Sequence, residues 1–160
     1  MTEARQRRDL SREECLRLLG EVPVGRVVFT QRALPAVRAV SHLVEGDQII
    51  FRADLGTAIS PEASGDRGTV VAYEADLIDV AESLGWSVVV VGRAAHVTDG
   101  AEVARYRRAL PSWAATGESD DIIAIRAGMV AGFRLESAPG LQAAQPSGAR
   151  HAAGPVAGPR

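Results

Sequence analysis

The sequence contains no lysine and no asparagine, and its only cysteine is Cys15. All 18 basic residues are therefore arginines, which excludes Schiff-base catalysis and phosphate-binding loops of the Gly-Lys-Ser/Thr type. A lone cysteine excludes disulfide frameworks and zinc or iron–sulfur sites built from several cysteines. The three histidines, His42, His96 and His151, are far apart and lack the spacing of metal ligands. We therefore expect no metal site.

Long apolar runs are also missing. The run Val88–Val91 is far shorter than a membrane span, and no signal-peptide segment follows the charged N-terminus. The net charge is −2, and residues 9–136 carry 19 acidic residues against 13 arginines. An acidic surface is the wrong sign for binding phosphate backbones. We expect a cytoplasmic protein that binds neither nucleic acid nor membrane.

A length of 160 residues is typical of a single domain with flexible ends. Residues 1–9 are highly charged and are predicted to form a flexible N-terminal arm. From residue 137 to residue 160, 15 of 24 positions are Ala, Pro or Gly, which is typical of a disordered tail. The folded domain is therefore predicted at residues 10–136.

The domain opens with a helix signature. Ser11 is followed three residues later by Glu14, the spacing of a capping box. The apolar face and the end of this helix are marked by Cys15, Leu18, Leu19 and Gly20. We expect Cys15 to be buried and unreactive.

Most of the remaining chain has the pattern of short β-strands. They are predicted at 24–30, 36–44, 48–52, 69–76, 86–97, 122–126 and 129–136, with a second helix at 100–110 and a helical turn near 57–63. Short strands joined by tight turns favour a mainly β fold, an antiparallel barrel with flanking helices. Consecutive β-branched residues after Trp86 predict a strand buried on both faces, by the barrel core and by either a helix or a second subunit.

Few residues suggest chemistry by themselves. Phe51 and Arg52 end a strand just before Gly56 and Thr57, and a guanidinium, a hydroxyl and free amides together suit a phosphate. The alternative is a solvated hairpin arginine. Likewise, His42 is either a ligand-binding residue or a half-buried strand histidine, and Trp86 is either a pocket residue or a core or interface aromatic.

The order and spacing of several segments resemble one known family. These are the capped helix beginning at Leu10, Gly25–Phe29, Leu34–Leu43, Ile50-Phe51-Arg52, Val71–Asp76 and Gly85-Trp86-Ser87-Val88. Over residues 10–136 the chain resembles the pyridoxamine 5′-phosphate oxidase-like flavoproteins of the FMN-binding split-barrel type, especially their small actinobacterial members.

The resemblance implies a six-stranded antiparallel split barrel that forms a homodimer and binds FMN between its subunits. By the same resemblance, the cofactor ring would contact Val40, Ser41 and His42, and the phosphate would contact the segments around Phe51-Arg52 and Gly56-Thr57. Trp86, Ser87 and Trp113 would help to close the site. His42 is the one candidate proton donor among these residues.

Three positions depart from the family pattern. Ala53 replaces the usual threonine, Ala58 the usual lysine, and Ala39 the usual proline. A charge-assisted phosphate contact contributes about 1.5–3 kcal/mol, so the missing lysine alone could weaken FMN binding roughly 10- to 100-fold.

The resulting hypothesis is a flavin-dependent oxidoreductase that binds FMN and transfers electrons to a small organic substrate, with the flavin supplying the redox chemistry. Two alternatives keep the fold. One is a reductase that uses a deazaflavin, and the other is a cofactor-free barrel with a binding or stress-related role.

Overall fold

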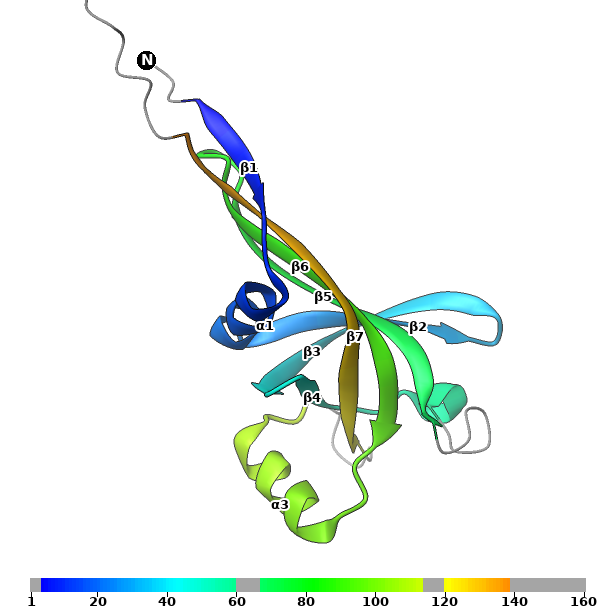
Figure 1. The fold of residues 1–160 in the computed structure, drawn as a ribbon. Coiled ribbons are helices and arrows are strands. Elements are labelled where there is room, and N and C mark those ends of the chain that lie inside the picture. The colour runs from blue at the N-terminus through cyan, green and yellow to red at the C-terminus, as the bar shows by residue number, and fades with distance from the viewer. Residues whose placement is uncertain (1–3, 60–66, 114–119, 139–160) are drawn as a thin grey trace, which may run out of the picture.

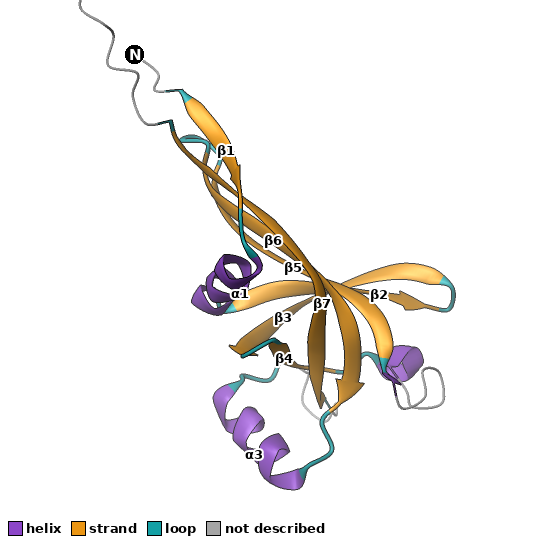
Figure 2. Ribbon diagram, viewed as in Figure 1, coloured by secondary structure: helices purple, strands orange, loops and turns teal. Residues whose placement is uncertain are grey.

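The computed structural model describes residues 4–59, 67–113 and 120–138, which form a mainly β protein with two α-helices (Figures 1 and 2). In chain order the elements are β1 (Arg5–Asp9), α1 (Arg12–Glu21), β2 (Val24–Gln31), β3 (Leu34–Glu45), β4 (Gln48–Ala53), a 3-10 helix (Gly56–Ile59), β5 (Thr69–Asp79), β6 (Leu84–His96), α3 (Gly100–Ala109) and β7 (Asp121–Ser137). No helix in the described ranges has the length and apolarity needed to cross a membrane.

The strands pair antiparallel in the order β1-β7-β4-β3-β2-β5-β6, and β6 pairs with β7 as well. This second pairing closes six strands into a barrel, so the predicted antiparallel barrel architecture is confirmed. Beyond the barrel, β5, β6 and β7 continue as a long twisted ribbon with β1 along its edge (Figure 1).

Strand β7 differs from its prediction because it is one strand of 17 residues rather than two short ones. Its pairing with β6 continues from Ile123 to Leu135, with an irregularity only opposite Val91 and Gly92. The Ala-Gly pair at 127–128 resembles a turn in the sequence, but the ladder to β6 absorbs it as a local bulge.

Residues 5–9 form strand β1, which corrects the prediction of a flexible arm. The C-terminal part of β7 has β6 as its neighbour on one side. Strand β1 is its neighbour on the other side, with Arg5 opposite Ser137 and Asp9 opposite Phe133. The predicted tail is also shorter at its start, because β7 extends through Ser137; residues 139–160 lie outside the described residues.

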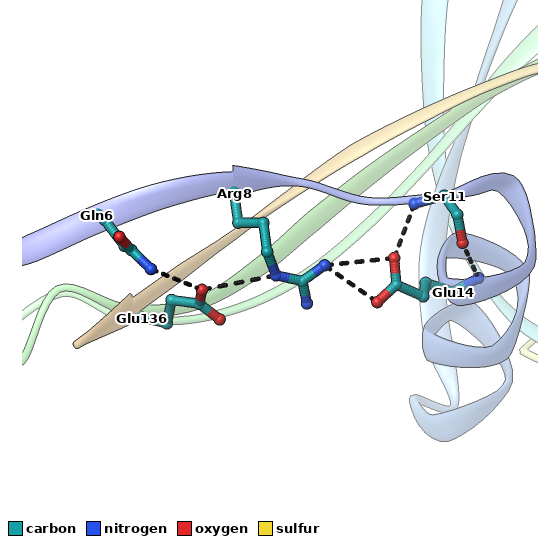
Figure 3. Close-up of polar contacts among 5 residues, drawn as sticks. All are labelled: Gln6, Arg8, Ser11, Glu14 and Glu136. Carbon is teal, nitrogen blue, oxygen red and sulfur yellow. Dashed lines mark hydrogen bonds and ion pairs between the residues drawn. The ribbon is translucent and has the colours of Figure 1, made fainter. Parts of the chain in front are cut away.

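Arg8 connects β1 with two other elements (Figure 3). Its guanidinium lies 3.1 Å from a carboxylate oxygen of Glu14 on α1 and 3.5 Å from one of Glu136 on β7, and Gln6 donates to Glu136 at 3.0 Å. Glu14 also accepts from the Ser11 amide at 2.8 Å, while Ser11 accepts from the Glu14 amide. The predicted capping box is therefore confirmed, and its glutamate also binds the arginine of β1.

Helix α1 passes the predicted stop at Gly20 by one residue and ends at Glu21. Cys15, Leu18 and Leu19 are buried, as predicted, and join the barrel core. The predicted turn near 57–63 is a 3-10 helix over Gly56–Ile59, and residues 60–66 lie outside the described part of the chain.

Helix α3 covers the outside of the barrel at the end opposite the ribbon (Figure 1). Tyr106 and Leu110 pack on Ile50 and Ile122 in a second apolar cluster. The Tyr106 hydroxyl donates to Glu45 at 2.7 Å, and this contact fixes the helix against the β3–β4 hairpin. The segment that follows α3 is thereby held near the ends of β3 and β4.

Candidate functional site

A cavity of about 260 Å³ opens where β3, β4 and the segments on either side of residues 114–119 meet. Arg38 and Val40 come from β3, Arg52 from β4, and Trp113 from the chain after α3. Asp120 completes the wall just before β7, because β4 pairs with β7 in the register Ala53 opposite Asp121. Of the predicted site residues, the structure brings together Val40, Arg52 and Trp113.

Arg52 is held by an acidic partner within this cavity. Its Nε donates to Asp120 Oδ1 at 2.8 Å, and its Nη1 reaches the carbonyl oxygens of Arg107 and Leu110 at 3.5 Å. The hydroxyl of Ser112 donates to the other oxygen of Asp120 at 2.7 Å. The Arg52 side chain therefore connects β4 with the end of α3 and the start of β7.

The electrostatics of Asp120 follow from these contacts. Burial alone would raise the pKa of this carboxyl, but the hydrogen bonds from Arg52 and Ser112 outweigh it and lower the pKa below its ordinary value. Asp120 is 6% exposed and stays ionised at neutral pH. Its charge balances that of Arg52, so Arg52 offers less net attraction to an incoming phosphate than the sequence pattern implies.

Arg38 is the cation of the cavity without a carboxylate partner among the described residues. It lies on an exposed stretch of β3, and Val27 is its neighbour across the pairing with β2. Trp113 is 54% exposed beside it, whereas Val40 is 3% exposed and provides an apolar wall. Together they combine a free guanidinium, an exposed indole and an apolar surface, a set that suits a planar aromatic ligand with a negative group.

His42 lies in the barrel core rather than at the cavity. Its Nε2 is 2.7 Å from the carbonyl oxygen of Leu19, so Nε2 carries the hydrogen, and its Nδ1 accepts from the Tyr73 hydroxyl at 2.6 Å. Burial lowers the pKa of His42, which stabilises the neutral ring. Both ring nitrogens have protein partners, so this geometry does not support the predicted role as proton donor.

Four other predicted residues lie in the core or on the 3-10 helix. Phe51 and Trp86 are 0% and 4% exposed and belong to the core, where Phe51 stacks on Tyr73. Gly56 and Thr57 are exposed on the 3-10 helix, and the Gly56 amide donates to Asp54 at 2.8 Å rather than lying free.

Ser41 and Ser87 do not line the cavity either. Ser41 is 8% exposed next to His42 on β3. Ser87 is half-buried and lines a separate surface hollow with Val89 and Phe133. The predicted binding region is therefore only partly assembled within one chain.

The sequence did not identify two cavity residues, Asp120 and Arg38, as site residues. Asp120 is 68 positions away from Arg52, and only the pairing of β4 with β7 brings them together. Arg38 lies in the predicted strand 36–44 with Ser41 and His42, but nothing in the sequence separates it from a solvated strand arginine.

Three comparisons relate this chain to known proteins. A family model described as pyridoxamine 5′-phosphate oxidase matches residues 11–141. An uncharacterized protein from Mycobacterium tuberculosis is 46% identical over 134 residues, which are 82% of this chain and 88% of the relative. The solved structure of an FAD binding protein from Mycobacterium smegmatis shares 30% identity at a TM-score of 0.61, covering 82% of this chain and 100% of that one.

The fold is also that of a putative pyridoxamine 5′-phosphate oxidase from Corynebacterium glutamicum, at a TM-score of 0.64 and 24% identity over 83% of this chain and 100% of that one.

Proposed function

The chain belongs to the pyridoxamine 5′-phosphate oxidase family, and from this premise we propose that it is a flavin-dependent oxidoreductase whose flavin lies at the cavity of Arg38, Val40 and Trp113. The observation that carries the proposal is the meeting of three groups in one cavity: a guanidinium that has no carboxylate partner among the described residues, an exposed indole and an apolar wall. The FAD binding protein from M. smegmatis, 30% identical to this chain, adds support.

The chemistry of these residues fits such a cofactor. The exposed indole of Trp113 offers a flat surface to a fused ring system, and the buried Val40 excludes water from one side. Arg38 provides a charge-assisted contact to a phosphate. Arg52, which already binds Asp120, would act mainly by positioning the segment that carries Ser112.

A bound flavin supplies hydride and single-electron transfer, so no side chain has to act as the redox centre. The task of this chain is to bind and orient the cofactor and to leave room for a small organic substrate. The buried His42 would contribute through the core, by holding α1 against β3 and β5, rather than by proton transfer.

FMN is the flavin that we propose, with a modest affinity. The cavity contains two arginines and two carboxylates, Asp54 and Asp120, so it has little net positive charge for a phosphate. Ala53 and Ala58 add neither a hydroxyl nor an ammonium. A deazaflavin is the alternative cofactor on the same fold.

One observation favours a second candidate function, a cofactor-free binding protein. Asp120 Oδ1 accepts a hydrogen bond from Arg52 Nε at 2.8 Å. The family resemblance assigns a phosphate contact to this same arginine. If this ion pair replaces the cofactor phosphate, the barrel would have kept its fold and lost its catalysis.

The test begins with the visible absorbance spectrum of the purified protein. The colourless form is then titrated with FMN, FAD, riboflavin and a deazaflavin by fluorescence or calorimetry. Micromolar binding of FMN supports the proposal. Tighter binding of the deazaflavin than of FMN would identify a deazaflavin as the cofactor. If none of the four compounds binds, the result favours the cofactor-free protein.

Arginine variants then locate the phosphate. We expect Arg38→Gln to weaken FMN about ten- to hundredfold, the effect of losing one charge-assisted contact, and to change riboflavin binding little. Arg52→Gln should weaken it less, because Arg52 is already neutralised. Arg108→Gln, on the exposed side of α3, is the matched control and should leave both affinities unchanged.

The same proposal includes a homodimer. On β6, Val88 and Val90 are buried in the barrel, but Val89 is 42% exposed on the outer face opposite Ala131. Helix α1 packs on the other face of β6 and β7, where Cys15 and Val88 share the core and Cys15 lies next to Gly132, and α3 packs on Ile50 and Ile122. Among the described residues, no helix therefore covers the outer face that carries Val89 (Figure 2). A second subunit is therefore the proposed cover for the second face of this strand.

A further inference from the structure

Two arginines face each other across the outer surface of the barrel. Arg93 on β6 and Arg126 on β7 are direct partners in the antiparallel register, so their side chains project from the same face. Both residues are exposed. Like charges in directly opposed positions of a sheet are destabilising, so this pair has a cost that the surrounding chain must offset.

No carboxylate among the described residues lies within ion-pair distance of either guanidinium. Arg93 donates to the carbonyl oxygen of Gly68 at 3.3 Å, and Arg126 makes no side-chain hydrogen bond in the described part of the chain. The cross-strand arginine Arg26 illustrates the usual arrangement, since it lies 3.2 Å from Glu74 on the neighbouring strand. Within the described ranges, no carboxylate therefore compensates the charge of the opposed pair.

The backbone beneath the pair is irregular. The register of β6 and β7 shifts between Val91 and Gly92, and a Cβ on Gly92 would lie 2.2 Å from the carbonyl oxygen of Arg126. Only glycine permits this close approach of the two strands. Bulges of this kind redirect side chains, and here the bulge lies at the base of the arginine pair.

A cleft of about 360 Å³ is lined by both arginines. Its remaining surface is mainly apolar and includes Val70, which is 57% exposed, and Met129, which is 67% exposed. Two cations at an apolar cleft match a molecule that has a negative group at one end and a hydrocarbon or aromatic body at the other.

We propose that this cleft, formed by Arg93, Arg126, Val70 and Met129, is a binding site for a small organic anion. The carboxylate, sulfonate or phosphate group would bind between the two guanidinium groups, where it removes their repulsion and accepts charge-assisted hydrogen bonds. The apolar body would lie against Val70 and Met129. The site shares no lining residue with the proposed flavin cavity. It lies on the same face of β6 as Val89 and therefore adjoins the proposed subunit contact.

The test compares two fluorescent probes that differ only by a sulfonate group. The full-length protein is titrated with 1-anilinonaphthalene-8-sulfonate and with N-phenyl-1-naphthylamine, which has the same rings and no sulfonate. We expect the sulfonate to bind at least about tenfold more tightly, equivalent to about 1.4 kcal/mol. The double variant Arg93→Gln/Arg126→Gln should remove this difference. Competition by benzoate should follow the same pattern.

Folding of the variant is checked by circular dichroism and thermal unfolding, and we expect it to be retained because both side chains are exposed. Arg108→Gln is the matched control, since it removes one exposed arginine of α3 that lines neither cavity and should preserve the preference for the sulfonate. Arg38→Gln shows whether the flavin cavity, which also suits an aromatic anion, binds the probe instead. Loss of the preference in Arg38→Gln but not in the double variant would overturn the proposal.

A second overturning result concerns the partner subunit. If the double variant keeps the preference for the sulfonate but alters the oligomeric state in sedimentation experiments, the two arginines bind a carboxylate of a second copy. Equal affinity of the unmodified protein for both probes would also exclude an anion site.

Discussion

The side chains that distinguish this barrel are polar groups buried in pairs. His42 and Tyr73 illustrate the arrangement, because the ring of His42 bridges the last turn of α1 and strand β5. Gly25 makes room for the pair, since a Cβ at that position would lie 2.4 Å from the Tyr73 hydroxyl. Burial raises the pKa of Tyr73, so its hydroxyl stays protonated and remains a donor to His42.

This pair predicts a pH dependence of stability. Burial lowers the pKa of His42 below its ordinary value of 6.5, so the unfolded chain takes up the proton first as the pH falls. The free energy of unfolding should therefore decrease below about pH 6.5, by at most about 1.4 kcal/mol per pH unit. Urea unfolding between pH 5 and pH 7.5 measures the slope.

The matched variant is His42→Gln, which keeps a donor and an acceptor but does not titrate. We expect a lower stability at neutral pH and a shallower dependence on pH. An unchanged slope in the variant would show that His42 does not carry the effect.

Asp120 allows a second prediction at the residue scale. Asp120→Asn removes the charge that binds Arg52 and Ser112 in a nearly buried position, so we expect a loss of roughly 1–3 kcal/mol in the free energy of unfolding. The same change frees the Arg52 charge and should increase the preference of the cavity for FMN over riboflavin. Both quantities are measured on one variant, by denaturation and by titration.

The two readouts separate two roles of the carboxylate. A loss of stability with no change in flavin preference would mean that Asp120 only ties β4 to the segment after α3. Arg105→Gln, which breaks an ion pair with Glu45 away from the cavity, serves as the control and should leave the flavin preference unchanged.

At the scale of elements, β1 is an addition to the barrel that stabilises one edge of the ribbon. Its five residues pair with β7, Arg7 lies 4.0 Å from the Phe133 ring centre, and Arg8 contacts both Glu14 and Glu136. The edge of β7 would otherwise be an open template for pairing with other chains.

Deletion of residues 1–7 tests this role. The truncated protein should lose roughly 2–4 kcal/mol in its free energy of unfolding, because the backbone pairing and the packing on Phe133 disappear together. It should also aggregate more readily. Urea unfolding and light scattering measure the two effects.

Arg8→Ala is the companion variant, and its effect should be much smaller than that of the deletion, because exposed ion pairs contribute little. If Arg8→Ala reproduces the whole effect of the deletion, the ion pairs rather than the strand hold this edge. If neither variant changes stability, β1 is dispensable for the fold.

At the scale of the whole molecule, the outer face of the ribbon remains without a cover in a single chain. Val89→Arg places a charge at the centre of the proposed subunit contact and should convert a dimer into a monomer, as measured by sedimentation velocity. Val80→Arg is the matched control, because Val80 is 84% exposed in the turn between β5 and β6 and should leave the assembly unchanged. An unmodified protein that sediments as a monomer contradicts the homodimer.

The local pattern of the sequence determined most of the elements, with β1 and the continuous β7 as the exceptions. The capping box at Ser11, the alternation of buried residues along β2 and the turn at Gly46 are read from neighbouring residues, because caps, strand faces and tight turns depend on short-range geometry. Short strands joined by tight turns already favoured an antiparallel barrel, and the family resemblance specified a six-stranded split barrel. It could not recognise β1, since the charged stretch Arg5–Asp9 forms a strand only where β7 offers a free edge.

The composition of the cavity was decided by the tertiary structure alone. Arg52 and Asp120 are brought together by the pairing of β4 with β7, and His42 is turned into the core by its contacts with Leu19 and Tyr73. Charge balance and burial are sums over residues distant in the chain, which no local pattern contains. The sequence by itself therefore determined most of the elements and the family, whereas the fold decided which arginines are neutralised and which are left to bind an anion.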